Sequence, residues 1–141
     1  MLKRIPKILS PQLVKALMEM GHGDEIVIAD ANFPSSTISE NVIRADGLSG
    51  TEILKALLEL FPLDSYVENQ VLLMEVVPDD DYKPVIWDNY QRILIDSGES
   101  FSIGYLDRFA FYDRAKKSYT IIATGEEALY ANIILIKGVV K

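Results

Sequence analysis

Short apolar runs alternate with segments of helical periodicity along this chain, and that alternation limits the folds open to it. The run at residues 25–29 is apolar on both faces of an extended strand, which is typical of a strand buried inside a parallel sheet. Further runs lie at 70–77, 101–105, 119–123 and 132–140. Because helical segments separate most of them, the sequence predicts one three-layer α/β/α domain over 1–141 with a mainly parallel sheet.

Cap residues mark where the main helices begin. Ser10 precedes Pro11, a favoured first helical residue, and Asp107 precedes the helix expected at 108–117. Ser49 and Glu52 have the spacing of a capping box, ahead of a helix at 50–61. The turn at 124–126 joins the last two predicted strands by a short connection, which allows an antiparallel pair, so we expect a mixed sheet.

Charge and composition exclude several partners. The net charge of −7 argues against nucleic acid and anionic membranes, because both reward clustered Lys and Arg. There is no cysteine, which excludes disulfides and thiolate chemistry and fits a reducing compartment. The amino end is too short and broken for a signal peptide, and no apolar run is long enough to span a membrane. We therefore expect a soluble cytoplasmic protein.

The only histidine and a nearby aspartate are the first candidates for chemistry. His22 lies between two glycines, so a ligand can reach its imidazole, which suits proton transfer near neutral pH. It is equally compatible with a histidine that merely occupies a helix-terminal turn. Asp30 follows the strand at 25–29, at the end where open α/β sheets bind ligands. Its alternative is a loop aspartate that bonds nearby backbone amides.

Two later segments offer polar side chains in pairs. Arg108 and Tyr112 are four residues apart and share one face of a helix. They suit a polar ligand, although from spacing alone an amphipathic surface helix with Arg108 paired to an acid is favoured. Tyr130 and Asn132 flank one residue before a strand, and in extended geometry they face the same side. That arrangement suits the hydroxyl groups of a ligand but is a weak signal by itself.

Several common sites are missing from the sequence. Gly21-His22-Gly23 lacks the third glycine of a dinucleotide loop and follows a helix rather than a strand. Neither a HExxH zinc motif nor a Gly-x-Ser-x-Gly elbow occurs. The acidic run 79–81 lacks the glycine and glutamate of an EF-hand loop and is typical of a solvated loop.

These segments together resemble the L-fucose mutarotase family, a relative of the ribose pyranase family. The resemblance covers nearly the whole chain, and its specificity lies in the order and spacing of motifs that are individually weak. The Arg108-to-Tyr112 block resembles the fucose branch, because the ribose branch typically has a histidine where Arg108 stands. The motifs that carry the resemblance are Met20-Gly21-His22-Gly23-Asp24-Glu25, Asp30-Ala31-Asn32-Phe33-Pro34, Ile43-Arg44-Ala45-Asp46-Gly47, Leu63-Asp64-Ser65-Tyr66, Arg108-Phe109-Ala110-Phe111-Tyr112, Thr124-Gly125-Glu126 and Tyr130-Ala131-Asn132.

The resemblance implies an enzyme that exchanges the α and β anomers of a free monosaccharide. It implies that His22 is the proton donor and that the protein forms ring-shaped homo-oligomers, often decamers, with sites near subunit boundaries. Asp64 is a further carboxylate that it points to, outside the main set. The residues that it assigns to substrate binding are Asp30, Arg108, Tyr112, Tyr130 and Asn132.

The chemistry of anomer exchange agrees with this set of side chains. The ring oxygen gains a proton as the anomeric hydroxyl loses one, which needs an acid and a base but no redox cofactor, metal or phosphate-binding group. We expect His22 to protonate the ring oxygen, Asp30 to orient His22 or to hold a hydroxyl, and the remaining residues to hold the other hydroxyls. Two alternatives stay open: a ribose pyranase, and a non-catalytic monosaccharide-binding module on the same fold.

Overall fold

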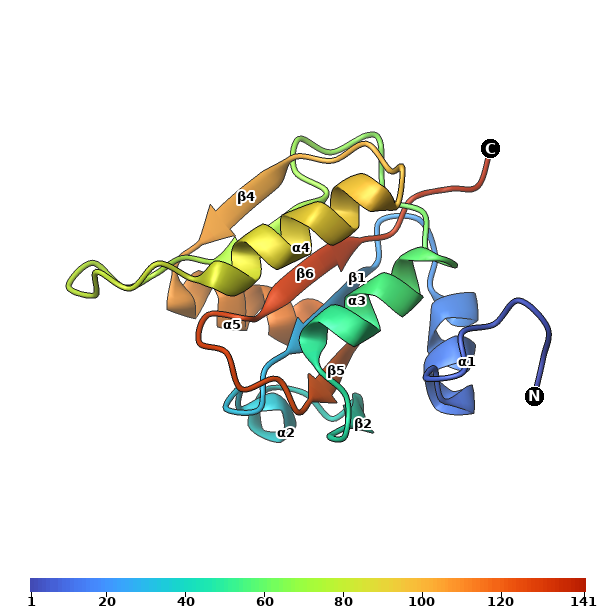
Figure 1. Cartoon of the computed structure of the whole chain (residues 1–141), viewed down its shortest axis with the longest axis horizontal. Coiled ribbons are helices and arrows are strands. Elements are labelled where there is room, and N and C mark those ends of the chain that lie inside the picture. Colours follow the sequence, from blue (N-terminus) through green and yellow to red (C-terminus); the bar gives the residue numbers. More distant parts are fainter.

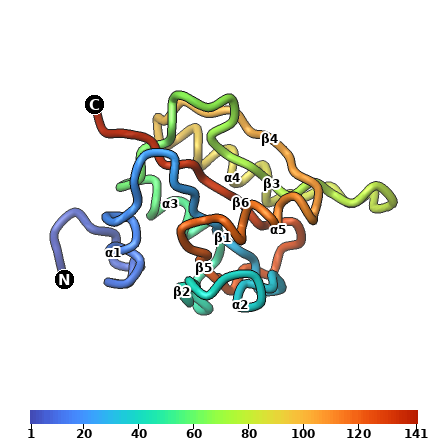
Figure 2. Tube along the Cα trace, turned by 180° about the vertical axis from the view of Figure 1, so that it is seen from behind, coloured from blue at the N-terminus to red at the C-terminus, as the bar shows by residue number.

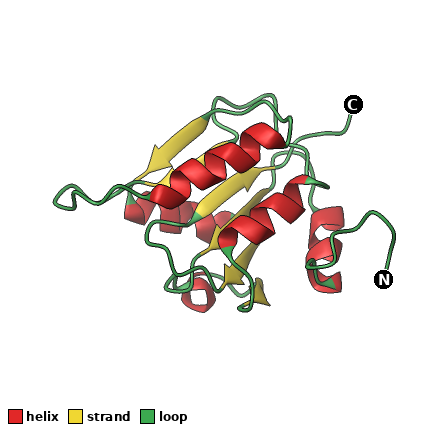
Figure 3. Ribbon diagram, in the orientation of Figure 1, coloured by secondary structure: helices red, strands yellow, loops and turns green.

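The structure, a computed structural model, describes residues 1–141 as a sheet covered by helices on both faces (Figures 1 and 3). This confirms the predicted three-layer α/β/α architecture. No helix is long and apolar enough to cross a membrane. In chain order, the elements are α1 (Pro11–Glu19), β1 (Glu25–Ala29), α2 (Ser35–Ile38), β2 (Val42–Ala45), α3 (Gly50–Leu58), β3 (Val71–Met74), α4 (Val85–Asp96), β4 (Ile103–Leu106), α5 (Arg108–Lys117), β5 (Thr120–Thr124) and β6 (Ile133–Ile136).

The sheet is mixed, with strand order β2-β5-β1-β6-β3-β4. β6 is antiparallel to both of its neighbours, β1 and β3, and all other pairs are parallel. The prediction of a mainly parallel, mixed sheet is therefore confirmed. The suggested pairing of the last two strands is wrong, because β1 lies between β5 and β6. A strand such as β1, whose residues from Ile26 to Ala29 are apolar on both faces, is best buried with partners on both sides, which places it at the centre.

Alternate residues of β1 face two different cores. Ile26 and Ile28 pack against α1, α3 and α4, whereas Val27 and Ala29 pack against α5. Figure 1 shows α3 and α4 in front of the sheet, and Figure 2 shows α5 and α2 on its other face. The period of two along a strand thus explains why Ile26 to Ala29 are all apolar.

The predicted helix starts are confirmed. Ser10 accepts a hydrogen bond from the Leu13 N–H, and Ser49 and Glu52 form the reciprocal capping box of α3. Asp107 caps α5 by accepting from two backbone N–H groups. The strand predicted at 70–77 is shorter, ending at Met74 where the chain leaves the sheet.

The strand directions create two opposite edges. At the edge that we call the carboxyl edge, five parallel strands end and β6 begins, so the residues after β1, β4 and β5 meet the residues before β6. At the opposite edge, the amino edge, the residues before β1 meet those after β6. Gly125 closes the carboxyl edge: a Cβ there would lie 2.0 Å from the Asp46 carbonyl oxygen, so only glycine fits.

Candidate functional site

His22 lies at the amino edge and is held by a carboxylate distant in sequence. Its Nε2 is 2.9 Å from Oδ1 of Asp64. The His22 side chain is 44% exposed, whereas that of Asp64 is only 3% exposed. The ring of Tyr66 lies 5.3 Å from the imidazole, centroid to centroid. A reachable imidazole oriented by a buried carboxylate suits general acid–base catalysis.

The position of Asp64 depends on the chain that follows β6. Leu63 forms an isolated bridge with Lys137, and the Asp64 N–H donates to the Ile136 carbonyl at 3.0 Å. Burial alone raises the pKa of Asp64, but the hydrogen bonds from His22 and from the Tyr66 N–H outweigh it and hold this pKa below its usual value. Asp64 is therefore charged at neutral pH, and its Oδ1 accepts a hydrogen bond from the Nε2–H group of His22.

Asp30 and Asn132 are joined by two hydrogen bonds at the carboxyl edge. The Asn132 amide donates to Oδ2 of Asp30 at 3.0 Å, and its Oδ1 accepts from the Asp30 N–H at 2.8 Å. Asp30 is 8% exposed and Asn132 4% exposed. Burial raises the pKa of Asp30, and the N–H groups that surround its carboxylate offset only part of this effect. The pair thus places hydrogen-bonded polar groups with little solvent exposure at the end of β1.

Arg108 and Tyr112 share one face of α5, as the spacing predicts. The Arg108 Nε donates to the Tyr112 hydroxyl at 3.0 Å, so Arg108 is not paired to an acid. The Tyr112 ring packs edge-on against Phe33 at 5.4 Å, in the loop that follows Asp30. This contact places Arg108 and Tyr112 at the carboxyl edge, beside the Asp30–Asn132 pair.

Tyr130 belongs to the same edge but not in the predicted geometry. Its φ of 57° is left-handed, so the expectation that Tyr130 and Asn132 face one side of an extended segment is wrong. The strand begins only at Ile133. The Trp87 indole N–H donates to the Tyr130 carbonyl at 2.8 Å, and the buried Tyr90 hydroxyl donates to the Ala131 carbonyl at 2.7 Å. Two side chains of α4 therefore fix the turn that precedes Asn132.

The candidate residues fall into two groups at opposite edges. β1 separates His22 from Asp30, and five extended residues span about 16 Å. Within one subunit Asp30 therefore cannot orient His22, and that expectation is wrong; Asp64 does so instead. Asp64 is 42 residues from His22 in sequence, so no local spacing relates the two, and only the motif 63–66 marked it.

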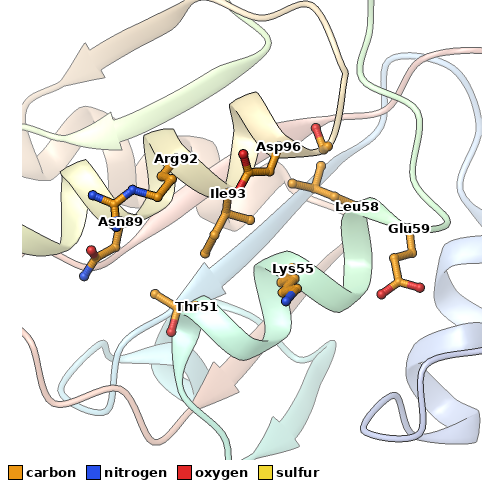
Figure 4. A pocket seen from close by; sticks show the side chains of 9 residues that line it. Thr51, Lys55, Leu58, Glu59, Asn89, Arg92, Ile93 and Asp96 are labelled. Atoms are coloured by element: carbon orange, nitrogen blue, oxygen red, sulfur yellow. The ribbon is translucent and has the colours of Figure 1, made fainter.

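The surface has two sizeable cavities, one at the amino edge and one between two helices. The first, of about 510 Å³, is lined by Ser65, by Val139 and Val140 near the chain end, and by Asp64, which holds His22. The other, of about 520 Å³, lies between α3 and α4 and contains none of the candidate residues (Figure 4). No group of three or more His, Asp or Glu side chains is placed to hold a metal ion.

Replacing Asn132 with aspartate tests the buried pair. Asn132→Asp sets a second carboxylate where the amide now donates to Asp30, and we expect a loss of about 3–5 kcal/mol of unfolding free energy at pH 7. Two facing carboxylates share a proton, so one folded-state pKa rises above its unfolded value. Stability should therefore be regained as the pH falls through the raised folded-state pKa, and lost again as the pH rises through it.

The measurement is thermal unfolding of the variant between pH 4 and pH 8. Asn32→Asp is the matched control, because Asn32 is exposed and only its backbone N–H contacts Asp30. Equal melting temperatures of the two variants across this pH range would contradict the described pairing.

Comparisons with known proteins agree on one family. The model of the RbsD / FucU transport protein family matches residues 3–140. The chain is 53% identical to fucose mutarotase from Bos taurus, over 98% of this chain and 94% of the relative. It is similar, with a TM-score of 0.95 and 54% identity over 99% of this chain and 100% of the other, to the crystal structure of the fucose mutarotase in complex with L-fucose from Streptococcus pneumoniae.

A more distant likeness links the fold to a ribose-binding relative. The structure of Bacillus subtilis RbsD complexed with D-ribose has a TM-score of 0.69 and 26% identity, over 94% of this chain and 95% of that one. The match of the family model to nearly the whole chain, together with close relatives over the same length, shows that the protein belongs to the RbsD / FucU transport protein family.

Proposed function

We propose that this protein interconverts the α and β anomers of L-fucose, or of a closely similar monosaccharide, by opening and closing the sugar ring. The observation that carries the proposal is the His22–Asp64 pair, a reachable imidazole held by a buried carboxylate. The names of the most similar relatives and the L-fucose complex of the Streptococcus pneumoniae protein support the choice of sugar.

His22 supplies the acid in this mechanism through its Nδ1. Because charged Asp64 accepts from Nε2, the proton of neutral His22 is fixed on Nε2, and Nδ1 is the nitrogen that exchanges protons with a ligand. The imidazolium form donates from Nδ1 to the ring oxygen, and the bond from that oxygen to the anomeric carbon breaks. The anomeric hydroxyl gives its proton to solvent water, and its oxygen becomes the aldehyde carbonyl oxygen. When the ring closes on the other face of the carbonyl, the open-chain hydroxyl returns its proton to Nδ1 of His22 and the carbonyl oxygen takes a proton from water, which restores the starting state.

The carboxyl edge supplies the groups that hold the sugar. We assign substrate binding to Asp30, Asn132, Tyr130, Arg108 and Tyr112, which offer both donors and acceptors to hydroxyl groups. The guanidinium of Arg108 uses only Nε on Tyr112, so its two terminal amino groups remain for the sugar. Several fixed polar groups that converge on one small ligand give orientation as well as affinity.

The two halves of the site come from different subunits in this proposal. A monosaccharide is shorter than β1, so it cannot touch His22 and Asp30 of the same subunit. If the amino edge of one subunit meets the carboxyl edge of the next, the contact joins two different surfaces. Contacts of this head-to-tail kind form a ring when the rotation between neighbouring subunits closes, and we propose such a ring-shaped homo-oligomer here.

Exposed apolar side chains at both edges support this contact. Phe109, Tyr105 and Leu129 are each more than half exposed near the carboxyl edge. Tyr66 and Val140 are more than two-thirds exposed at the amino edge. Large exposed apolar groups that gather around polar sites are typical of interaction surfaces. A decameric assembly and a cytoplasmic location remain predictions, for sedimentation and cell fractionation to test.

Saturation-transfer NMR tests the proposed reaction directly. With a catalytic amount of protein, saturating the α-anomer signal of L-fucose should deplete the β-anomer signal well beyond the uncatalysed transfer. Line broadening of fucose without faster exchange would instead identify a non-catalytic sugar-binding module. The chain would then use the fold of its relatives for binding alone.

D-Ribose is the matched comparison for specificity. The higher structural similarity to the fucose complex than to the ribose complex favours fucose, as does the Arg108–Tyr112 pair. We expect exchange between pyranose and furanose signals of ribose to be accelerated less than fucose anomer exchange at equal protein concentration. Faster exchange on ribose than on fucose would identify a ribose pyranase.

A further inference from the structure

The side chain of Tyr130 is held by the loop between β3 and α4. Figure 1 shows this loop, residues 75–84, projecting away from the sheet on the left. The Tyr130 hydroxyl donates to Oδ2 of Asp80 at 2.7 Å. The Tyr130 ring stacks on that of Tyr82, with centroids 6.0 Å apart and an angle of 26° between the planes. A loop with no candidate residue of its own thus reaches the proposed sugar-binding edge.

Asp80 is itself fixed before it meets Tyr130. Its Oδ1 accepts from the Tyr82 N–H at 2.9 Å, and its own N–H donates to the Val77 carbonyl at 3.0 Å. This is an aspartate-stabilised turn, in which one carboxylate oxygen orders the loop and the other is left for a partner. Asp80 is half-buried, whereas its neighbours Asp79 and Asp81 are exposed and make no side-chain hydrogen bond. The acidic run therefore contains one residue with a distinct role.

The hydrogen bond determines what Tyr130 can offer a ligand. A phenol has a single proton, and that of Tyr130 is directed to Asp80. The same hydrogen bond raises the pKa of Tyr130 and lowers that of Asp80, so the phenol stays protonated and the carboxylate charged at neutral pH. The phenol oxygen therefore presents only lone pairs outward. A sugar hydroxyl that meets it must donate.

We propose that Asp80 is a positioning residue for sugar binding, which acts through Tyr130 by fixing the phenol oxygen as a hydrogen-bond acceptor. The inference rests on the proposed function, because it takes Tyr130 as a sugar contact. It adds a specificity rule: the sugar must place a hydroxyl, not an ether oxygen or a carbonyl, against Tyr130. Trp87, which holds the Tyr130 carbonyl, keeps the residue in its left-handed conformation while Asp80 aims its hydroxyl.

Asp80→Asn is the test, with Asp79→Asn and Asp81→Asn as matched controls. All three remove one negative charge from the same loop, but only the first changes the partner of Tyr130. An amide can also donate to the phenol oxygen, which removes a lone pair from the sugar. We expect the KM for L-fucose anomer exchange to rise about tenfold in Asp80→Asn, with kcat changed much less, because the contact is present in ground and transition states alike. The controls should match the unmodified protein.

A double-substitution cycle with Tyr130→Phe separates positioning from other roles. If Asp80 acts through the phenol, Asp80→Asn should add no further rise in KM once Tyr130→Phe has removed the hydroxyl. An equal rise in both backgrounds, or an Asp80→Asn protein with the KM of Asp79→Asn, would overturn the inference.

A readout that needs no activity completes the design. With 13C-labelled tyrosine, the Cζ resonance of Tyr130 is the one lost in Tyr130→Phe, and it should shift in Asp80→Asn but not in Asp79→Asn. An unmoved resonance would refute the hydrogen bond itself. If the unmodified protein failed to accelerate anomer exchange while the resonance shifted as expected, the proposed function would fail and the Asp80–Tyr130 contact would stand.

Discussion

Replacing His22 with glutamine is expected to slow fucose anomer exchange by about 10²- to 10⁴-fold, the contribution that a positioned acid or base typically makes. Glutamine retains a polar side chain of comparable length that can still reach Asp64, but it exchanges no proton near neutral pH. The KM for fucose should change little, because the proposed sugar-binding residues lie at the other edge. The rate is measured by saturation transfer, with the melting temperature as the control for folding.

Asp64→Asn is the companion variant. It preserves the shape of the buried side chain and removes the charge that fixes the proton on Nε2 of His22. We expect a substantial loss of kcat that is smaller than that of His22→Gln, since the imidazole remains but its orientation and tautomer are no longer fixed by a carboxylate. A folded His22→Gln protein with the full exchange rate would show that the acid is another group.

Local sequence signals predicted the elements well because their causes are local. Ser10, Ser49 and Asp107 each satisfy backbone N–H groups within three residues, so the caps can be read without knowing the fold. The apolar run 25–29 predicted β1 within its observed bounds because both of its faces are buried. These features would be recognisable in any chain with the same short motifs.

Strand order could not be read in the same way. β5 and β6 are close in sequence, yet β1 lies between them because pairing depends on partners far apart in the chain. Strands that are buried on both faces, such as β1, β5 and β6, carry no alternation that distinguishes one neighbour from another. The mixed character of the sheet was predicted, but β6, the antiparallel strand, pairs with β1 and β3 and not with β5.

The site shows the same division between local and distant causes. The Arg108–Tyr112 contact follows from helical spacing and was predictable. The His22–Asp64 and Tyr130–Asp80 contacts join residues 42 and 50 positions apart, and neither has a local signal. Tyr130 also adopts a left-handed conformation that tyrosine seldom takes, so no propensity would have predicted its orientation.

The central claim is that one sugar contacts the amino edge of one subunit and the carboxyl edge of the next. Two variants that each damage one edge can test it. His22→Gln inactivates the acid alone, and the double variant Arg108→Gln/Tyr130→Phe removes two proposed sugar contacts alone. Each protein by itself should be nearly inactive, because every site in it contains one damaged half.

Co-expression of the two variants with different affinity tags, followed by purification on both tags, is the most direct measurement. In a mixed ring with random order, about one site in four joins two intact halves, so the rate per subunit should recover to about a quarter of that of the unmodified protein. Mixed rings that are no more active than either variant alone would place both halves in one subunit and contradict the account.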